Sequence, residues 1–195
     1  MKYAAMALVA ALAGIVVGLA GLPFDGCTDN TPVLQARIDS LQNVVKKYAD
    51  EKAAIDARLV RFDSLDFDVY SHQKWDLLGV SHADNIVVNW PDGRQTRDIA
   101  THIEDLKGMF VFAPDTRIEE HPIRFGSGDY TCVTGTLLGT FSKPMPVGKG
   151  KTIKPTGKSF KVPMCTVGHW QGGKMVEESL FWDNQAFMKQ IGLAK

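Results

Sequence analysis

The sequence predicts an α+β domain in which a few helices cover one face of a curved antiparallel sheet. Two observations lead to this prediction. Apolar residues at helical spacing occur in the first part of the chain and again at its end. Between residues 116 and 182, threonine-rich and β-branched runs follow one another, separated by glycine and proline turns. Helices and strands segregated in this way are typical of α+β folds.

Composition limits the possible classes of function. The chain has 195 residues, enough for one domain and a short appendage. Lys and Arg number 22 and so do Asp and Glu, which gives a formal net charge of zero. Without a basic stripe, the sequence does not favour a nucleic-acid partner. Neither Cys-x-x-Cys nor His-x-x-x-His occurs, so we expect no structural zinc, no metal and no organic cofactor.

The N-terminus predicts export. Lys2 precedes the uncharged apolar run Ala4–Leu22. Residues 1–22 therefore have the pattern of a secretory signal peptide, and the run is also long enough for a retained membrane anchor. Cys27 is a candidate for lipidation or, alternatively, an unpaired thiol. In each case we expect a protein of the cell envelope, either anchored in the membrane or released to the periplasm or the extracellular space.

Residues 23–32 form a turn-rich linker that ends at Thr31 and Pro32, a favourable helix start. Apolar residues then recur with alternating spacings of four and three, a period of about 3.5. Two alternatives follow: a coiled-coil stalk, or a helix that packs on the domain's own sheet. We expect a stalk helix over residues 33–47, a domain over residues 48–195, and a homodimer or larger homo-oligomer. The apolar positions are Leu34, Ile38, Leu41, Val45, Tyr48, Ile55, Leu59 and Phe62.

The later elements follow in order. A short helix is predicted over Phe67–Leu78, and a strand over Asn85–Trp90 before a Pro-Asp-Gly turn. Ile99, Ile103 and Leu106 have helical spacing within the next segment, Thr96–Asp115. The last helix is predicted over residues 184–193, with Asp183 as its N-cap. The strands between these helices are predicted at Thr116–Gly126, Asp129–Phe141, Ser159–Trp170 and Lys174–Trp182.

Four runs together resemble the SnoaL-like polyketide cyclases of the ester cyclase type, which have the nuclear transport factor 2-like fold. They are "WPDGRQTRDIATHIEDLKGMFVFAPDTRI", "GDYTCVTGTLLGTF", "PTGKSF" and "GGKMVEE" with "WDNQAFMKQIGL". The resemblance covers roughly Tyr48 to Leu193. It implies a cone, in which a strongly bent sheet wraps around about three helices and leaves an apolar pocket. Characterised members close a polyketide ring with an Asp on the last strand and a His on the strand beside it.

This sequence departs from that catalytic pair. The Asp position of the family falls on Leu180 and the His position on Thr166, and neither side chain can transfer the proton. Phe141 stands where the family often has another His. Three hypotheses stay open: a domain that binds a small apolar molecule without this chemistry, an enzyme that uses Glu178 as its base, and a non-catalytic envelope scaffold.

The last hairpin provides most of the predicted pocket. A three-residue turn, Gly172–Lys174, would place residue 166 opposite 180, 168 opposite 178 and 170 opposite 176. A two-residue Gly-Gly turn would shift the register by one and reverse part of this face. With Trp90 and Phe112, which are alternatively core residues, the predicted pocket residues are Thr166, Trp170, Glu178, Leu180 and Trp182.

Glu178 is the candidate catalytic residue. Desolvation beside two tryptophans would raise the pKa of its carboxyl group, as acid–base catalysis requires. It could equally orient a ligand or form a structural ion pair.

The histidines and cysteines carry weaker predictions. We expect His82 in a solvated loop or at the pocket mouth, His102 on the surface of its helix, and His121 exposed. His169 and Glu177 are predicted as a cross-strand pair on the other face of the sheet. Cys132 and Cys165 are either a disulfide or two small apolar side chains.

Overall fold

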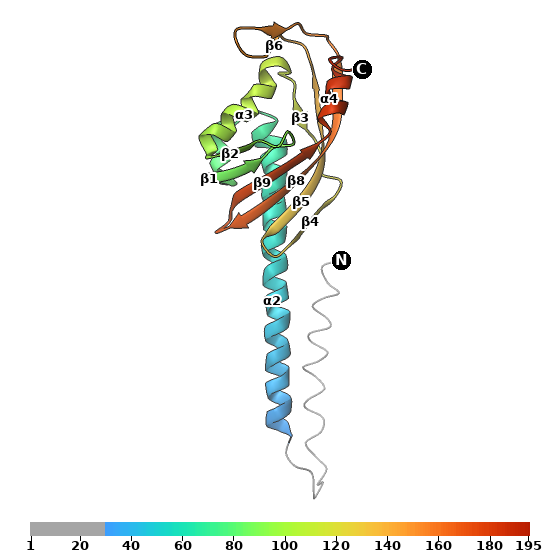
Figure 1. Ribbon diagram of the computed structural model, residues 1–195. Helices are drawn as coiled ribbons and strands as arrows, with labels where there is room; N and C mark the ends of the chain where they lie inside the picture. The colour runs from blue at the N-terminus through green and yellow to red at the C-terminus, as the bar shows by residue number, and fades with distance from the viewer. Residues whose placement is uncertain (1–29) are drawn as a thin grey trace, which may run out of the picture. The chain divides into compact units, whose positions relative to one another are not determined.

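The fold is that of a computed structural model, which describes residues 30–195 (Figure 1). The predicted signal peptide or anchor (residues 1–22), Cys27 and most of the linker lie outside the described residues, so these remain predictions. None of the helices within residues 30–195 combines the length and the apolar character that crossing a bilayer requires.

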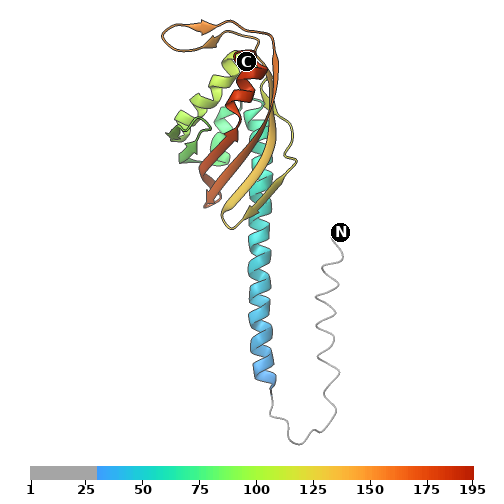
Figure 2. The same cartoon turned by 45° about the vertical axis from the view of Figure 1, so that its right-hand side comes forward.

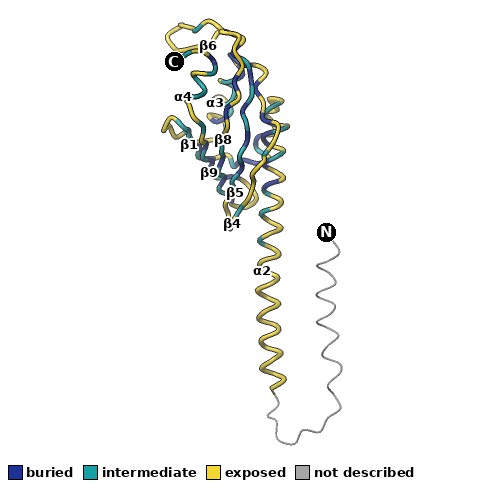
Figure 3. Tube along the Cα trace, turned by 90° about the vertical axis from the view of Figure 1, so that its right-hand side faces the viewer, coloured by how far each residue is buried: buried dark blue, intermediate teal, exposed yellow. Residues whose placement is uncertain are grey.

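Helix α2 runs without a break over Thr31–Ser64. Contacts within the chain divide it into two units. The first ends at Val45, inside α2, and the second comprises Lys46–Lys195. Along the first unit the apolar stripe is exposed, as the yellow tube in Figure 3 shows. The predicted pairing of this stripe with a second copy of the chain stays a prediction.

Within the second unit, the apolar stripe of α2 becomes buried and packs in the core of the domain. Leu59 and Phe62 are buried, whereas Tyr48 is exposed. Arg58 fixes this part of the helix, because its guanidinium donates to the Gly128 carbonyl at 2.6 Å and to Asp129 at 2.8 Å. The C-terminal end of α2 therefore packs on the domain's own sheet, which is one of the two alternatives that the sequence left open.

The helix predicted over Phe67–Leu78 is divided into two elements of different geometry. The π-helical turn η2 (Leu65–Tyr70) continues α2, and the 3-10 helix η3 (Trp75–Val80) follows. Gln73 between them has a φ of 55°, which lies in the left-handed region and interrupts a right-handed helix. The wider π turn buries four of its six residues, and one of the four is the charged Asp66.

The main sheet has the strand order β2-β1-β9-β8-β5-β3, with β4 also paired to β5. All pairings are antiparallel except that of β1 with β9, which is parallel. The sequence predicted antiparallel pairing throughout. Its local patterns could not show that β1 lies beside the last strand of the sheet. The strands are β1 (His82–Asn89), β2 (Gln95–Arg97), β3 (Arg117–Ile118), β4 (Arg124–Ser127), β5 (Tyr130–Thr140), β8 (Ser159–Gln171) and β9 (Lys174–Trp182).

The sheet curves around the end of α2 and around α3 (Ile99–Phe112), as Figure 2 shows. The short strands β6 (Met145–Pro146) and β7 (Thr152–Ile153) form a separate ribbon. Helix α4 (Asn184–Gln190) follows β9, and the Asp183 carboxylate accepts a hydrogen bond from the Ala186 amide at 2.9 Å. This is the N-cap geometry that the sequence predicts.

The β8–β9 hairpin combines the two registers that the sequence offered. Thr166 lies opposite Leu180 and Gly168 opposite Glu178, as the three-residue turn predicts. A bulge follows, and Trp170 lies opposite Met175 instead of Val176. The turn itself is the two-residue Gly172-Gly173, with φ values of 56° and 79° that favour glycine. The bulge absorbs the extra residue, so the pocket end of the hairpin keeps the predicted register.

Asp98 caps α3 and makes its stability dependent on pH. Its carboxylate accepts from the Thr101 amide at 2.7 Å and from the Thr101 hydroxyl at 3.0 Å, and these bonds lower the pKa of Asp98. Its stabilising effect is therefore present above about pH 4 and is lost as the pH falls through the lowered pKa. We expect Asp98→Ala to have a lower Tm than wild type at pH 7, with a difference that shrinks in acid. Asp98→Asn, which keeps an acceptor, is the control, and a difference independent of pH would contradict the prediction.

Candidate functional site

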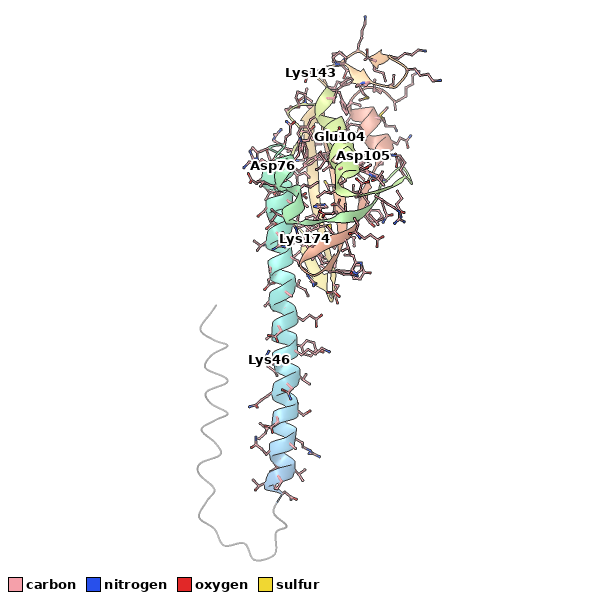
Figure 4. All side chains as sticks on the ribbon, turned by 90° about the vertical axis from the view of Figure 1, so that its left-hand side faces the viewer. Lys46, Asp76, Glu104, Asp105, Lys143 and Lys174 are labelled. Atoms are coloured by element: carbon pink, nitrogen blue, oxygen red, sulfur yellow. The ribbon has the colours of Figure 1, made fainter. Side chains whose placement is uncertain are left out.

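A cavity of about 150 Å³ lies between the sheet, α3 and η2. Figure 4 shows α3 with Asp105, which is one of the residues on the cavity wall. Most of the wall is apolar, and it includes members of both hydrophobic clusters of the core, such as Leu65 and Ile118. The predicted pocket residues on the wall are Trp90, Phe112, Thr166, Glu178, Leu180 and Trp182.

Trp170 is not on this wall, contrary to the sequence prediction. Its ring is fully buried in the core against Phe62, with ring centroids 6.2 Å apart, and its indole N–H donates to the Thr131 hydroxyl at 2.8 Å. Trp170 keeps the buried face of β8 that it shares with Thr166 and Gly168, but at its end of the strand this face is covered by Phe62 of α2.

Glu178 lies in the cavity between two histidines. Its Oε2 atom is 3.3 Å from Nε2 of His102 and 3.7 Å from Nε2 of His82. All three residues are buried, and Glu178 is 5% exposed. They come from three elements, since His82 begins β1, His102 lies in the first turns of α3 and Glu178 is in the middle of β9. The expectations of a solvated His82 and a surface His102 were therefore wrong.

The tautomer of His82 follows from its neighbour. The Ser81 hydroxyl donates to the Leu78 carbonyl at 3.1 Å, so its oxygen is available to accept from Nδ1–H of His82 at 2.8 Å. Nε2 of a neutral His82 then has a lone pair facing the carboxylate. Among the described residues, this buried Nε2 atom has no hydrogen-bond partner.

The expected rise in the pKa of Glu178 is reversed by these histidines. Burial alone would raise the pKa of this carboxyl, but the adjacent imidazoles of His102 and His82 outweigh burial and lower it. The sequence prediction included desolvation and missed the two imidazoles. Glu178 is therefore held in its ionised form.

These three side chains are also the group of described residues that could hold a metal ion, because their donor atoms lie within 4.8 Å of one another. Two imidazoles and one carboxylate are a donor set used by several divalent transition ions. The metal content of the purified protein is therefore a necessary control in any test of this site.

A second cluster reaches the cavity through Asp66. Its Oδ2 atom is 2.8 Å from Nε2 of His121, and Nδ1 of the same ring is 2.9 Å from Oδ1 of Asp63. Arg124 donates to the other oxygen of Asp63. The expectation of an exposed His121 was wrong, since its side chain is 1% exposed. Sequence reasoning missed Asp66 altogether, and a charged residue within an apolar helical run was the one available signal.

The outer face of the last hairpin does not join this site. His169 lies opposite Glu177 as predicted, but its ring stacks on Tyr130, with centroids 4.5 Å apart. Glu177 instead accepts from Asn89 at 2.8 Å. Cys132 and Cys165 are free thiols with sulfur atoms 3.5 Å apart, so the disulfide alternative is not realised.

Comparisons with known proteins agree on one family. The family model for SnoaL-like polyketide cyclases matches residues 63–191. A candidate SnoaL-like polyketide cyclase from Jannaschia sp. CCS1 has 19% identity and a TM-score of 0.62, covering 72% of this chain and 95% of its own. IdmH, a candidate polyketide cyclase from Streptomyces antibioticus, has 19% identity and a TM-score of 0.59, covering 69% and 98%.

A third structure, a candidate polyketide cyclase from Acidithiobacillus ferrooxidans, has 22% identity and a TM-score of 0.57, covering 71% of this chain and 94% of its own. At these identities, the likeness to solved structures establishes the fold. No curated protein matches this sequence.

Proposed function

This chain belongs to the SnoaL-like polyketide cyclase family, and we propose that it is an enzyme that removes a proton from a carbon atom of a small, mainly apolar carbonyl compound. The observation that carries the proposal is the buried Glu178 carboxylate between His82 and His102 on the wall of the cavity. Proton abstraction beside a carbonyl is the first step of an aldol cyclisation, of many isomerisations and of some eliminations.

The environment of Glu178 suits a base. The two imidazoles hold Glu178 in the ionised form that can accept a proton, and the apolar wall limits the access of water to it. Thr166 adds a buried hydroxyl on the same wall, whose Oγ1 atom has no partner among the described residues and is free to bond a substrate oxygen.

The proposal accounts for the missing catalytic pair of the family. Leu180 occupies the position of the family's Asp, and Glu178 lies two residues earlier on the same face of β9. Two residues along a strand correspond to about 7 Å, so the base has moved by one pleat within the same cavity. The longer Glu side chain and the two histidines take the place of the Asp and His of characterised members.

The test is whether the protein eliminates 5-nitrobenzisoxazole, a small aromatic compound that releases a coloured nitrophenolate when a base removes one proton from carbon. We expect wild-type protein to accelerate this reaction and Glu178→Gln to lose the acceleration. The metal content of the same preparation is measured, and the elimination activity must persist in metal-free protein. Acceleration that is equal in both proteins would contradict the role of Glu178.

A second candidate function is binding without catalysis. The mainly apolar cavity and the absence of the family's pair favour it. Under this alternative, wild-type protein binds 5-nitrobenzisoxazole in the cavity, detected by quenching of its tryptophan fluorescence, and does not convert it.

A further inference from the structure

The cavity has a second polar wall beside the one that carries Glu178. Asp66 lies on it, in the π-helical turn η2, and is buried. In the part of the chain that the structure describes, its carboxylate forms no hydrogen bond or ion pair with Glu178, His82 or His102. It bonds His121, whose ring packs between Phe67 at 4.6 Å and Phe62 at 5.9 Å between centroids.

From Asp66 a continuous line of hydrogen bonds leads out of the cavity. Both ring nitrogens of His121 are used, Nε2 toward Asp66 at 2.8 Å and Nδ1 toward Asp63 at 2.9 Å. From His121 outward the exposure increases, from 1% for its side chain to 25% for Asp63 and 44% for the partner of Asp63, Arg124. One end of this line therefore lies on the cavity wall and the other end reaches solvent.

The three groups are suited to sharing a proton. Burial raises the pKa of Asp66. The hydrogen bond between Asp66 and His121 offsets this rise only in part, and the charge of Glu178 raises the pKa further. Burial would lower the pKa of His121, but the hydrogen bonds and charges of Asp66 and Asp63 outweigh it and raise the pKa. The pKa of Asp66 is therefore shifted in the direction that a proton donor needs.

We infer that Asp66 is the general acid of this cavity and that His121 and Asp63 form a relay that returns protons to it from solvent. This inference rests on the proposed function, in which Glu178 is the base. Asp66 touches the substrate, whereas His121 and Asp63 act through Asp66.

The step is balanced for a simple ketone. Glu178 takes a hydrogen from the carbon beside the carbonyl as a proton. The electron pair of the broken C–H bond forms the C=C bond of an enol, and the electrons of the C=O π bond move to oxygen. Asp66 supplies the proton to this oxygen, His121 supplies one to Asp66, and the relay takes one from water. The proton on Glu178 leaves in the reverse reaction or to solvent.

Two probes separate the acid from the base. 5-Nitrobenzisoxazole needs a base, but its nitrophenolate is a weak base that needs little protonation as it leaves. Enolisation of 2-indanone, a ring system of similar size, needs both a base at carbon and an acid at oxygen. It is followed in D₂O by the loss of the α-hydrogen signals in proton NMR. The ratio of the two rates is the readout, because a merely structural effect lowers both rates together.

With the full chain, we expect Asp66→Asn to lower the exchange of 2-indanone by about 10- to 100-fold relative to the elimination of 5-nitrobenzisoxazole. Asp63→Asn, at the exposed end of the relay, should lower exchange by about threefold or more relative to elimination. The matched control is Asp68→Asn, in the same π-helical turn but exposed and paired with Lys74 at 2.7 Å, which should change neither rate.

The outcomes distinguish the two proposals. Full exchange by Asp66→Asn, or equal losses of both rates in Asp66→Asn and Asp63→Asn, would overturn the relay and leave the role of Glu178 intact. Absence of elimination by wild-type protein would instead contradict the proposed function. A lower ratio of exchange to elimination in both variants would establish Asp66 as the acid.

Discussion

Replacing Trp170 by alanine should lower the free energy of unfolding by about 3–5 kcal/mol. The side chain is fully buried where the end of α2 meets the sheet, against Phe62 and with a hydrogen bond to Thr131. Removing it leaves a cavity between two layers that cannot close without moving α2, and it leaves a buried hydroxyl without its donor. Equilibrium unfolding of the full chain in urea measures the change.

Trp170→Phe is the control for this prediction. Phenylalanine keeps most of the apolar ring and loses the N–H that bonds Thr131, so its cost should be clearly smaller than that of alanine. The elimination rate per folded molecule should stay close to wild type in Trp170→Phe, because the ring does not line the cavity. A loss of less than about 1.5 kcal/mol in Trp170→Ala would mean that the ring is a pocket residue, as the sequence first suggested.

Replacing Glu178 by glutamine should lower kcat/KM for 5-nitrobenzisoxazole by about 10²–10⁴-fold. The amide has nearly the same shape as the carboxylate but cannot take a proton at neutral pH. KM should change much less than kcat, because the probe is held mainly by the apolar wall. Initial rates over a range of probe concentrations separate the two constants.

Glu177→Gln is the matched control. The two glutamates are neighbours on β9, but Glu177 points to the other face of the sheet, where it accepts from Asn89 at 2.8 Å. A glutamine there still offers an oxygen to Asn89, so activity and stability should remain near wild type. Equal losses in Glu178→Gln and Glu177→Gln would indicate damage to the strand instead of loss of a base.

Local sequence patterns were sufficient for much of the fold. The hydroxyl and proline at Thr31 and Pro32 mark the start of α2, and Asp183 marks the start of α4. The Gly172-Gly173 turn is placed correctly, and alternation along β8 and β9 brings Thr166, Glu178 and Leu180 to one face. Each of these depends on residues close together in the sequence, whose physical preferences are local.

The surroundings of Trp170 show where such patterns stop. Alternation along β8 places Trp170 correctly on the buried face, and the bulge changes the alternation of β9, where Met175 is buried in place of Val176. Nothing in the sequence distinguishes a three-residue turn from a two-residue turn with a bulge. Nor does it show that the buried face at Trp170 is covered by Phe62, which belongs to a helix more than a hundred residues earlier.

The sequence by itself determined the α+β class, the family resemblance and Glu178 as the candidate base. Only the tertiary structure decided what surrounds that base, because His82, His102 and Glu178 come from β1, α3 and β9 and meet through the curvature of the sheet. Asp66 and His121 likewise meet only in the fold. Each histidine has an ordinary local context. Its burial, its partner and the sign of the pKa shift it causes depend on contacts that no local periodicity specifies.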